Sequence, residues 1–211
     1  MVLDSHRDKA EVVLLPVAKK FRNVNPNLLT WIALLSAVLA GVFFYLAESN
    51  LFILLGAFMV LFNSFFDALD GRVAKLAGKA SKKGDFLDHA FDRYADIFII
   101  GGIAFGPLSR LWIGFLALLG VLMTSYMGTQ AHAVGVGRNY GGIAGRADRL
   151  ILLIFVPIVF VVLDIFYTTR FMVFEYRIGF MELLMIWLAV TGHLTAVHRG
   201  ISSWRELKKK E

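Results

Sequence analysis

Long apolar runs alternate with short polar segments along most of the chain. From residue 25 onward this pattern predicts six membrane-spanning helices, because most runs approach the length that crosses a bilayer and the short third run continues a helix that starts in a polar stretch. Asn25-Pro26-Asn27 is a start signal for the first helix, and Gly106-Pro107 ends the third. The expected apolar segments are 28–47, 51–66, 97–105, 111–132, 150–167 and 178–198. Pro157 is expected to kink the fifth.

The two ends of the chain are more polar than its middle. Residues 3–21 mix apolar positions with Lys9, Lys19 and Lys20, which predicts an amphipathic helix lying in the membrane interface. Pro16 is expected to bend or end that helix. We therefore divide the chain into an interfacial helix (1–24), a six-helix transmembrane domain (25–199) and a basic tail (200–211).

Composition places the chain in the membrane as an all-α protein. Hydrophobic residues make up 58% of the 211 residues and the mean hydropathy is +0.67, above the apolar share of soluble domains. The chain has no cysteine, which excludes disulfides and thiolate metal sites. Its net charge of +6 does not indicate nucleic-acid binding, because the bases gather at the ends of apolar runs. Membrane lipids are the expected partners of these bases.

The distribution of basic residues predicts an orientation in the membrane. All but three of the 22 Lys and Arg residues fall on the side that carries both termini and the polar stretch 67–92. The exceptions are Arg110, Arg170 and Arg177. The positive-inside rule therefore predicts a multi-pass protein of the plasma membrane with this stretch and both termini in the cytoplasm.

The polar stretch 67–92 contains two pairs of aspartates at helical spacing. Asp67 and Asp70 follow the second apolar run, while Asp88 and Asp92 precede the third, so each pair projects from one helix face. Four carboxylates at close range repel one another unless cations neutralise them. Oxygen ligands suit Mg²⁺ or Mn²⁺, and we expect two ions.

Small residues flank these acids one helical turn away. Gly71 follows Asp67, Ala74 follows Asp70 and Gly84 precedes Asp88. They leave room for a ligand beside the carboxylates, although small residues also allow close packing of membrane helices. Both interpretations remain open at this point.

The spacing D-x-x-D-G-x-x-A-K, eight residues, then G-x-x-x-D-x-x-x-D resembles the signature of the CDP-alcohol phosphotransferases, also called CDP-alcohol phosphatidyltransferases. These are membrane enzymes of phospholipid head-group synthesis. The chain departs from the signature at Lys75, where the family usually carries Arg.

The resemblance implies transfer of a substituted phosphate group from a CDP-linked lipid, such as CDP-diacylglycerol or CDP-archaeol, to a small polar alcohol with release of CMP. It implies metal ligation by Asp67, Asp70, Asp88 and Asp92, with Asp92 also the general base. It implies nucleotide binding by Asp70, Gly71, Ala74, Lys75 and Gly84. It further implies a homodimer.

The acceptor site is less evident from the sequence. Family members that use inositol phosphate carry basic residues at the positions of Gly128 and Gln130 in the segment SYMGTQAHA. Arg138, Arg146 and Arg149 follow in the next connection and could bind an acceptor phosphate instead. The positive-inside rule explains these bases equally well.

Two other functions use acidic groups in membrane helices. An intramembrane prenyltransferase acting on a pyrophosphate needs two separated acidic motifs, and this chain has one cluster. A divalent-cation transporter should carry acids near mid-membrane on several helices. Asp164 and Glu182 lie toward the opposite side from the cluster and are not expected to take part in chemistry.

Overall fold

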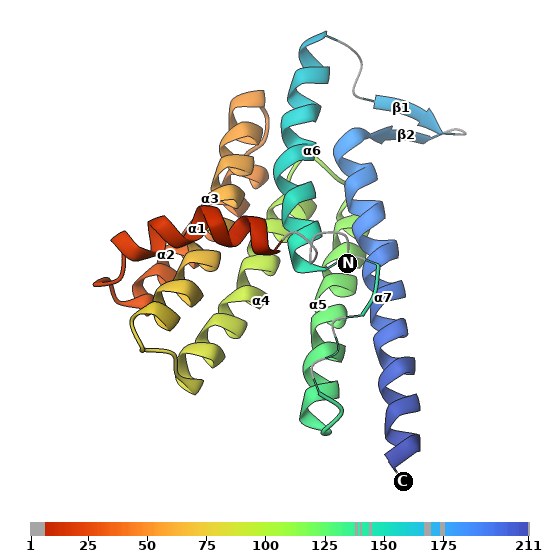
Figure 1. Ribbon diagram of the computed structural model, residues 1–211. Coiled ribbons are helices and arrows are strands. Elements are labelled where there is room, and N and C mark those ends of the chain that lie inside the picture. The colour runs from red at the N-terminus through yellow and green to blue at the C-terminus, as the bar shows by residue number, and fades with distance from the viewer. Residues whose placement is uncertain are drawn as a thin grey trace.

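The computed structural model describes residues 7–137, 139, 141–143, 145–166, 170–173 and 176–210. Seven helices and one small hairpin make up the described chain (Figure 1). They are α1 (Arg7–Lys20), α2 (Pro26–Tyr45), α3 (Asn50–Leu76), α4 (Lys82–Phe105), α5 (Leu111–Ala133), α6 (Arg146–Phe166), β1 (Arg170–Val173), β2 (Tyr176–Gly179) and α7 (Phe180–Lys210).

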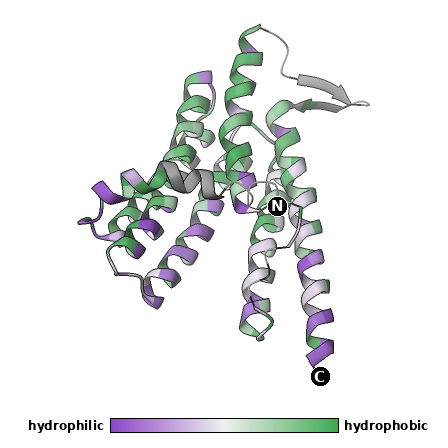
Figure 2. Cartoon of the chain, viewed as in Figure 1, coloured by the Kyte–Doolittle hydropathy of each residue, from purple (hydrophilic) through white to green (hydrophobic). Residues whose placement is uncertain are grey.

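The prediction of an all-α integral membrane fold is confirmed. Five helices, namely α2, α3, α5, α6 and α7, are long and apolar enough to cross a membrane. The remaining predicted span, the third in chain order, is α4, whose first half carries aspartates that lower its hydropathy (Figure 2). The count of six spans is thus approximate, because one helix is polar over half its length.

Side-chain caps fix where two helices near the polar stretch begin. The Asn25 side chain accepts a hydrogen bond from the Asn27 backbone N–H at 3.1 Å, with Pro26 as the first residue of α2. At α4, Ser81 Oγ accepts from the Gly84 N–H at 3.1 Å. These caps fix the helical phase in which the acids of α4 appear.

Small residues bring neighbouring helices into close contact. α2 packs against α3 and α4, and α5 packs along α7. Gly41 of α2 faces Gly102 of α4 so closely that a Cβ on either would collide with the backbone opposite. Between α5 and α7 a Cβ on Gly192 would likewise collide with the backbone of Gly120, and Thr124 Oγ1 donates to the Gly192 carbonyl at 2.8 Å. These contacts join the bundle around the acidic stretch.

The N-terminal helix α1 crosses the other helices instead of running along them (Figure 1). It continues through Pro16 to Lys20, whereas the sequence predicted a bend or an end at the proline. Its last turns pack on the bundle, because Ala18 is buried with Leu29, Leu69 and Val73. This position suits the predicted interfacial helix.

Two helix boundaries and one additional hairpin differ from the prediction. α6 begins at Arg146 instead of residue 150, where the Asp148 carboxylate accepts from the Gly145 N–H at 2.9 Å and stabilises the first turn. α7 continues to Lys210, because residues 201–210 contain no proline or glycine to end it. An antiparallel hairpin pairs Arg170 with Gly179 between α6 and α7, which the sequence did not predict.

Candidate active site

Three carboxylates from two helices converge at the end of the bundle that carries the α3–α4 connection. Asp67 lies near the end of α3, and Asp88 and Asp92 lie one turn apart on α4. One oxygen from each lies within 4.8 Å of the other two. The structure thus brings together three of the four aspartates predicted to bind metal.

Asp70 lies one turn beyond Asp67 on α3 and outside this group of three. Its side chain is buried, and its Oδ2 accepts no hydrogen bond from any described residue. A buried carboxylate oxygen without a donor is destabilising unless a cation neutralises it. The set of hard oxygen ligands at Asp67, Asp88 and Asp92, with Asp70 adjacent, therefore fits Mg²⁺ or Mn²⁺.

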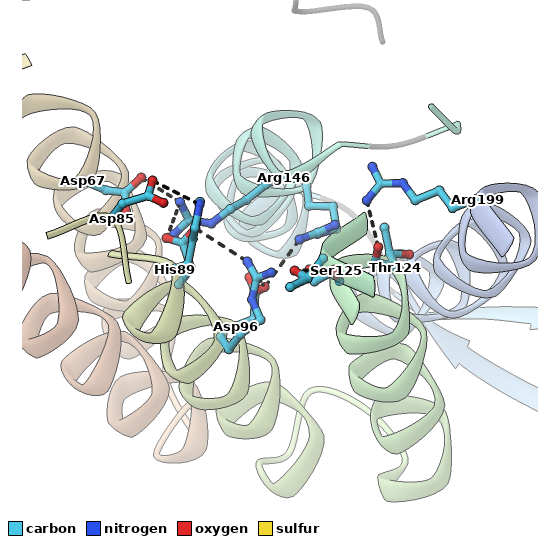
Figure 3. Close-up of polar contacts among 12 residues, drawn as sticks. Asp67, Asp85, His89, Asp96, Thr124, Ser125, Arg146 and Arg199 are labelled. Carbon is cyan, nitrogen blue, oxygen red and sulfur yellow. Dashed lines mark hydrogen bonds and ion pairs between the residues drawn. The ribbon is translucent and has the colours of Figure 1, made fainter. Parts of the chain in front are cut away.

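Arginines from α4 and α6 link these acids into a chain of opposite charges. Arg146 Nη1 lies 2.6 Å from Asp67 Oδ2 and 2.7 Å from Asp92 Oδ1 (Figure 3). Arg93 Nη2 lies 3.6 Å from Asp92 Oδ2 and 3.5 Å from Asp96 Oδ2. Arg149 Nη2 donates to Asp96 Oδ2 at 3.4 Å with both side chains 4% exposed. The positive charges partly offset the repulsion among the acids.

A cavity of about 940 Å³ opens beside the carboxylates, between α4, α5 and α6. Asp67 and Asp92 line it, whereas Asp70 and Asp88 do not. Its wall also carries four arginines, which are Arg93, Arg146, Arg149 and Arg199. Asp67, Asp92 and Asp148 are the acids of the same wall, so its arginines outnumber its carboxylates and favour an anionic molecule beside Asp92.

Arg146 and Arg149, predicted to lie in a connection, stand on the first turn of α6 at this cavity. Arg138 lies outside the described residues. Arg199, which was not predicted from the sequence, reaches in from α7 and donates to the Thr124 carbonyl at 2.8 Å (Figure 3). It also donates to the Gly141 carbonyl at 2.8 Å. A Cβ on Gly128 would lie 3.0 Å from Arg199 Nη1, so the glycine on α5 leaves room for this guanidinium group.

The two glycines of the motif, Gly71 and Gly84, do not serve close helix packing. A Cβ on Gly71 would meet no atom within 4 Å, and one on Gly84 would meet only Ser81 Oγ at 3.4 Å. Ala74 is half-buried, and Lys75 is exposed on the last turn of α3. Among the described residues nothing packs tightly on either glycine, which favours the ligand interpretation over the packing one.

Asp164 and Glu182, which were not expected to take part in chemistry, bind polar side chains at the opposite end of the bundle. Glu182 Oε1 accepts from Arg110 Nε at 2.7 Å, and Asp164 Oδ2 accepts from Asn50 Nδ2 at 3.1 Å. In the described part of the chain, the carboxylates that converge are those of α3 and α4. This single cluster at one end agrees poorly with a cation path through mid-membrane.

A family model described as CDP-alcohol phosphatidyltransferase matches residues 23–197. An archaetidylinositol phosphate synthase of Pyrococcus horikoshii is 41% identical over 130 residues, covering 62% of this chain and 67% of the relative. A phosphatidylinositol phosphate synthase of Cutibacterium acnes is 30% identical over 187 residues, covering 85% of this chain and 86% of the relative.

Solved structures give a consistent result. The phosphatidylinositol phosphate synthase of Mycobacterium tuberculosis with CDP-DAG bound is similar with a TM-score of 0.71 and 25% identity, over 91% of this chain and 94% of that one. Its complex with manganese and citrate gives a TM-score of 0.71 and 25% identity, over 90% and 88% of the two chains. Members of the CDP-alcohol phosphatidyltransferase family are divalent-metal-dependent transferases of substituted phosphate groups in phospholipid biosynthesis. Because the family model matches most of its length, this chain belongs to that family.

Proposed function

We propose that the chain transfers the lipid-phosphate group of a CDP-lipid to a phosphorylated polyol of the inositol phosphate type, with release of CMP. The observation that carries the proposal is the cavity beside Asp92, whose wall holds four arginines. Guanidinium groups bind phosphate through paired hydrogen bonds, so a phosphorylated acceptor matches this wall better than a neutral alcohol. The names of the relatives agree with such an acceptor.

In this mechanism Asp67, Asp70, Asp88 and Asp92 would hold the divalent cations, which would supply positive charge to the pyrophosphate oxygens of the donor. Asp92 accepts the proton of the acceptor hydroxyl, whose oxygen bonds to the lipid-linked phosphorus as the bond from that phosphorus to the CMP oxygen breaks. Asp92 lines the acceptor cavity and also belongs to the carboxylate group, so it can contact both substrates.

The remaining residues position the two substrates. Arg146 and Arg149 orient the acceptor phosphate, and Arg138 is a further proposed contact. Gly71, Ala74 and Gly84 let the cytidine and pyrophosphate approach the backbone of α3 and α4, and Lys75 places a point charge near the phosphates. The open space beside Gly71 supports this arrangement.

An acceptor panel tests the function directly. Purified protein would receive Mn²⁺, either CDP-diacylglycerol or CDP-archaeol, and one of inositol phosphate, inositol, glycerol phosphate or serine, while CMP release is measured. We expect release with inositol phosphate to exceed that with free inositol by about tenfold or more, since one phosphate contact to arginine is worth more than 1.4 kcal/mol. Equal rates with inositol phosphate and free inositol would show that the protein does not recognise the acceptor phosphate. Comparing the two donors would show whether it uses an acyl or an isoprenoid lipid.

A matched pair of glycine variants tests the proposed nucleotide contact. Gly71→Ala should leave the melting temperature unchanged or slightly raised, because the added Cβ meets no neighbour, and should weaken CDP-lipid binding. Gly102→Ala should lower stability by about 1–3 kcal/mol, because its Cβ would collide with the backbone of Gly41. If Gly71→Ala lowered the melting temperature as much as Gly102→Ala, Gly71 would be a packing residue.

We propose that the motif end faces the cytoplasm of a plasma-membrane protein, as the basic residues favour. Because the chain has no native cysteine, single cysteines can be introduced to report which side of the membrane a residue lies on. Ala80→Cys in the exposed α3–α4 connection should resist an impermeant thiol reagent added to intact cells, whereas Ser49→Cys in the opposite turn should react. The reverse labelling pattern would contradict this orientation.

We propose in addition that two copies of the chain associate in the membrane, as the family resemblance implies. Exposed apolar side chains cover the outer faces of the spans, and lipid or a second copy can cover them equally well. Chemical cross-linking of the protein in native membranes should yield a dimer band, and a monomer band alone would contradict the association.

A further inference from the structure

One nitrogen of Arg146 contacts two of the three converging carboxylates. Nη1 donates to Asp67 Oδ2 at 2.6 Å and lies 2.7 Å from Asp92 Oδ1, yet that second oxygen accepts no hydrogen bond from any described residue. The Arg146 Nε–H is also buried and lacks a hydrogen-bond partner among the described residues. The guanidinium group is therefore held by charge attraction with its hydrogen bonding incomplete.

A divalent cation at Asp67, Asp88 and Asp92 would be held by the two carboxylates that Arg146 also contacts. Two positive groups cannot share these carboxylates without strong repulsion, since like charges a few ångströms apart at a partly buried site cost several kcal/mol. The cation brings the greater charge and binds carboxylate oxygens directly. Arg146 and the cation should therefore compete for the cluster.

The cavity beside Asp92 can receive the Arg146 side chain when it leaves the acids. That side chain is 21% exposed and lines the large cavity beside Asp92, at the first turn of α6. Arg149, one turn further along α6, pairs instead with Asp96, which is outside the carboxylate group. Arg149 thus pairs with an acid outside the proposed metal site, whereas Arg146 pairs with two acids of that site.

We propose that Arg146 is an exchangeable counter-ion of the metal site. It neutralises Asp67 and Asp92 before the cation binds, and the arriving cation displaces its guanidinium group into the cavity, where it binds the phosphate of the acceptor. Metal binding thereby creates part of the acceptor site, and by linkage the acceptor phosphate strengthens metal binding. This inference rests on the proposed metal and acceptor sites, and it adds a competition between them.

Metal affinity gives a test that does not depend on turnover. Mn²⁺ binding to purified protein would be measured from the electron paramagnetic resonance signal of free Mn²⁺, for the wild type, Arg146→Gln and the matched control Arg149→Gln. Removing the competing charge should tighten Mn²⁺ binding by about tenfold or more in Arg146→Gln, and by less than about threefold in Arg149→Gln. Unchanged or weaker Mn²⁺ binding in Arg146→Gln would overturn the proposal and make Arg146 a brace for the acids.

Thermal melting covers the case in which the variant is unstable. If Arg146 is a counter-ion, Arg146→Gln should melt well below the wild type in EDTA, and saturating Mn²⁺ should remove most of that difference. A variant that remains unfolded in Mn²⁺ would show that the cation cannot replace the guanidinium group, which contradicts the exchange.

Sulfate serves as the probe for the displaced guanidinium group. Calorimetry should show that saturating Mn²⁺ strengthens sulfate binding to the wild type by about fivefold or more, and that Arg146→Gln loses this coupling. The same coupling in both proteins would refute the movement of Arg146 to the phosphate. Wild-type protein that binds no Mn²⁺ and releases no CMP would instead count against the proposed function itself.

Discussion

Asp88→Asn is expected to abolish CMP release, with a loss of about 10³-fold or more, because it removes both a charge and an oxygen ligand from the group formed with Asp67 and Asp92. The amide has nearly the same size as the carboxylate, so the fold of α4 should be kept. Asp67→Asn should have an effect of the same order. CMP release with a CDP-lipid and Mn²⁺ measures turnover, and the resonance signal of free Mn²⁺ measures ligand loss.

Asp85→Asn is the matched control on the same helix. Asp85 precedes Asp88 by one turn, is exposed, and lies 3.5 Å from His89 instead of joining the converging carboxylates. We expect it to keep turnover within about threefold of the wild type, as for a surface substitution. Wild-type turnover in Asp88→Asn, or full turnover of the wild type in excess EDTA, would refute the metal site.

Local signals in the sequence accounted for the helices and for the acidic cluster. Asn25 marks a helix start through its own side chain, so its effect can be read without knowing the rest of the fold. The aspartate spacing gives the helix face directly, and the structure brings Asp67 together with Asp88 and Asp92 while Asp70 lies outside that group.

Contacts between distant segments could not be predicted in the same way. Asp96 follows the acidic stripe of α4, but only the packing of α6 brings Arg149 to it across 53 residues of sequence. Arg199 had no signal beyond its basic charge, and its bonds to Thr124 and Gly141 depend on how α7 packs on α5. Periodicity describes one helix at a time, so it cannot show which charges from different helices meet.

The glycines show how a structure separates two interpretations of the same residue type. Gly41 and Gly102 are needed because backbones touch there, whereas Gly71 faces open space. In the sequence all three appear as small residues in or beside apolar helices. Only the arrangement of the neighbouring helices distinguishes space required by the protein from space left for a substrate.

Asp92→Asn is expected to lower turnover by about 10²–10⁴-fold, the range for loss of a general base. Asp92 differs from Asp88 because it lines the large cavity between α4, α5 and α6 as well as joining the carboxylate group. If its main role is proton abstraction, the amide variant should keep CDP-lipid affinity within about tenfold, or 1.4 kcal/mol, of the wild type. Asp70→Asn, which removes a buried carboxylate beside the cluster, should instead weaken Mn²⁺ and donor binding together.

Binding measurements separate the two roles of Asp92, because a base and a ligand fail differently. Calorimetry with CDP-lipid and Mn²⁺ would be run on Asp92→Asn beside Asp70→Asn and Asp88→Asn, with turnover measured on the same preparations. A base-only role predicts a large fall in turnover with nearly intact Mn²⁺ affinity. The ion contact between Asp92 Oδ1 and Arg146 Nη1 makes this comparison sensitive, since the amide also frees the guanidinium group from one of its two acids. If Asp92→Asn lost Mn²⁺ as completely as Asp88→Asn, Asp92 would be a metal ligand first, and the proton acceptor would have to be sought elsewhere on the cavity wall.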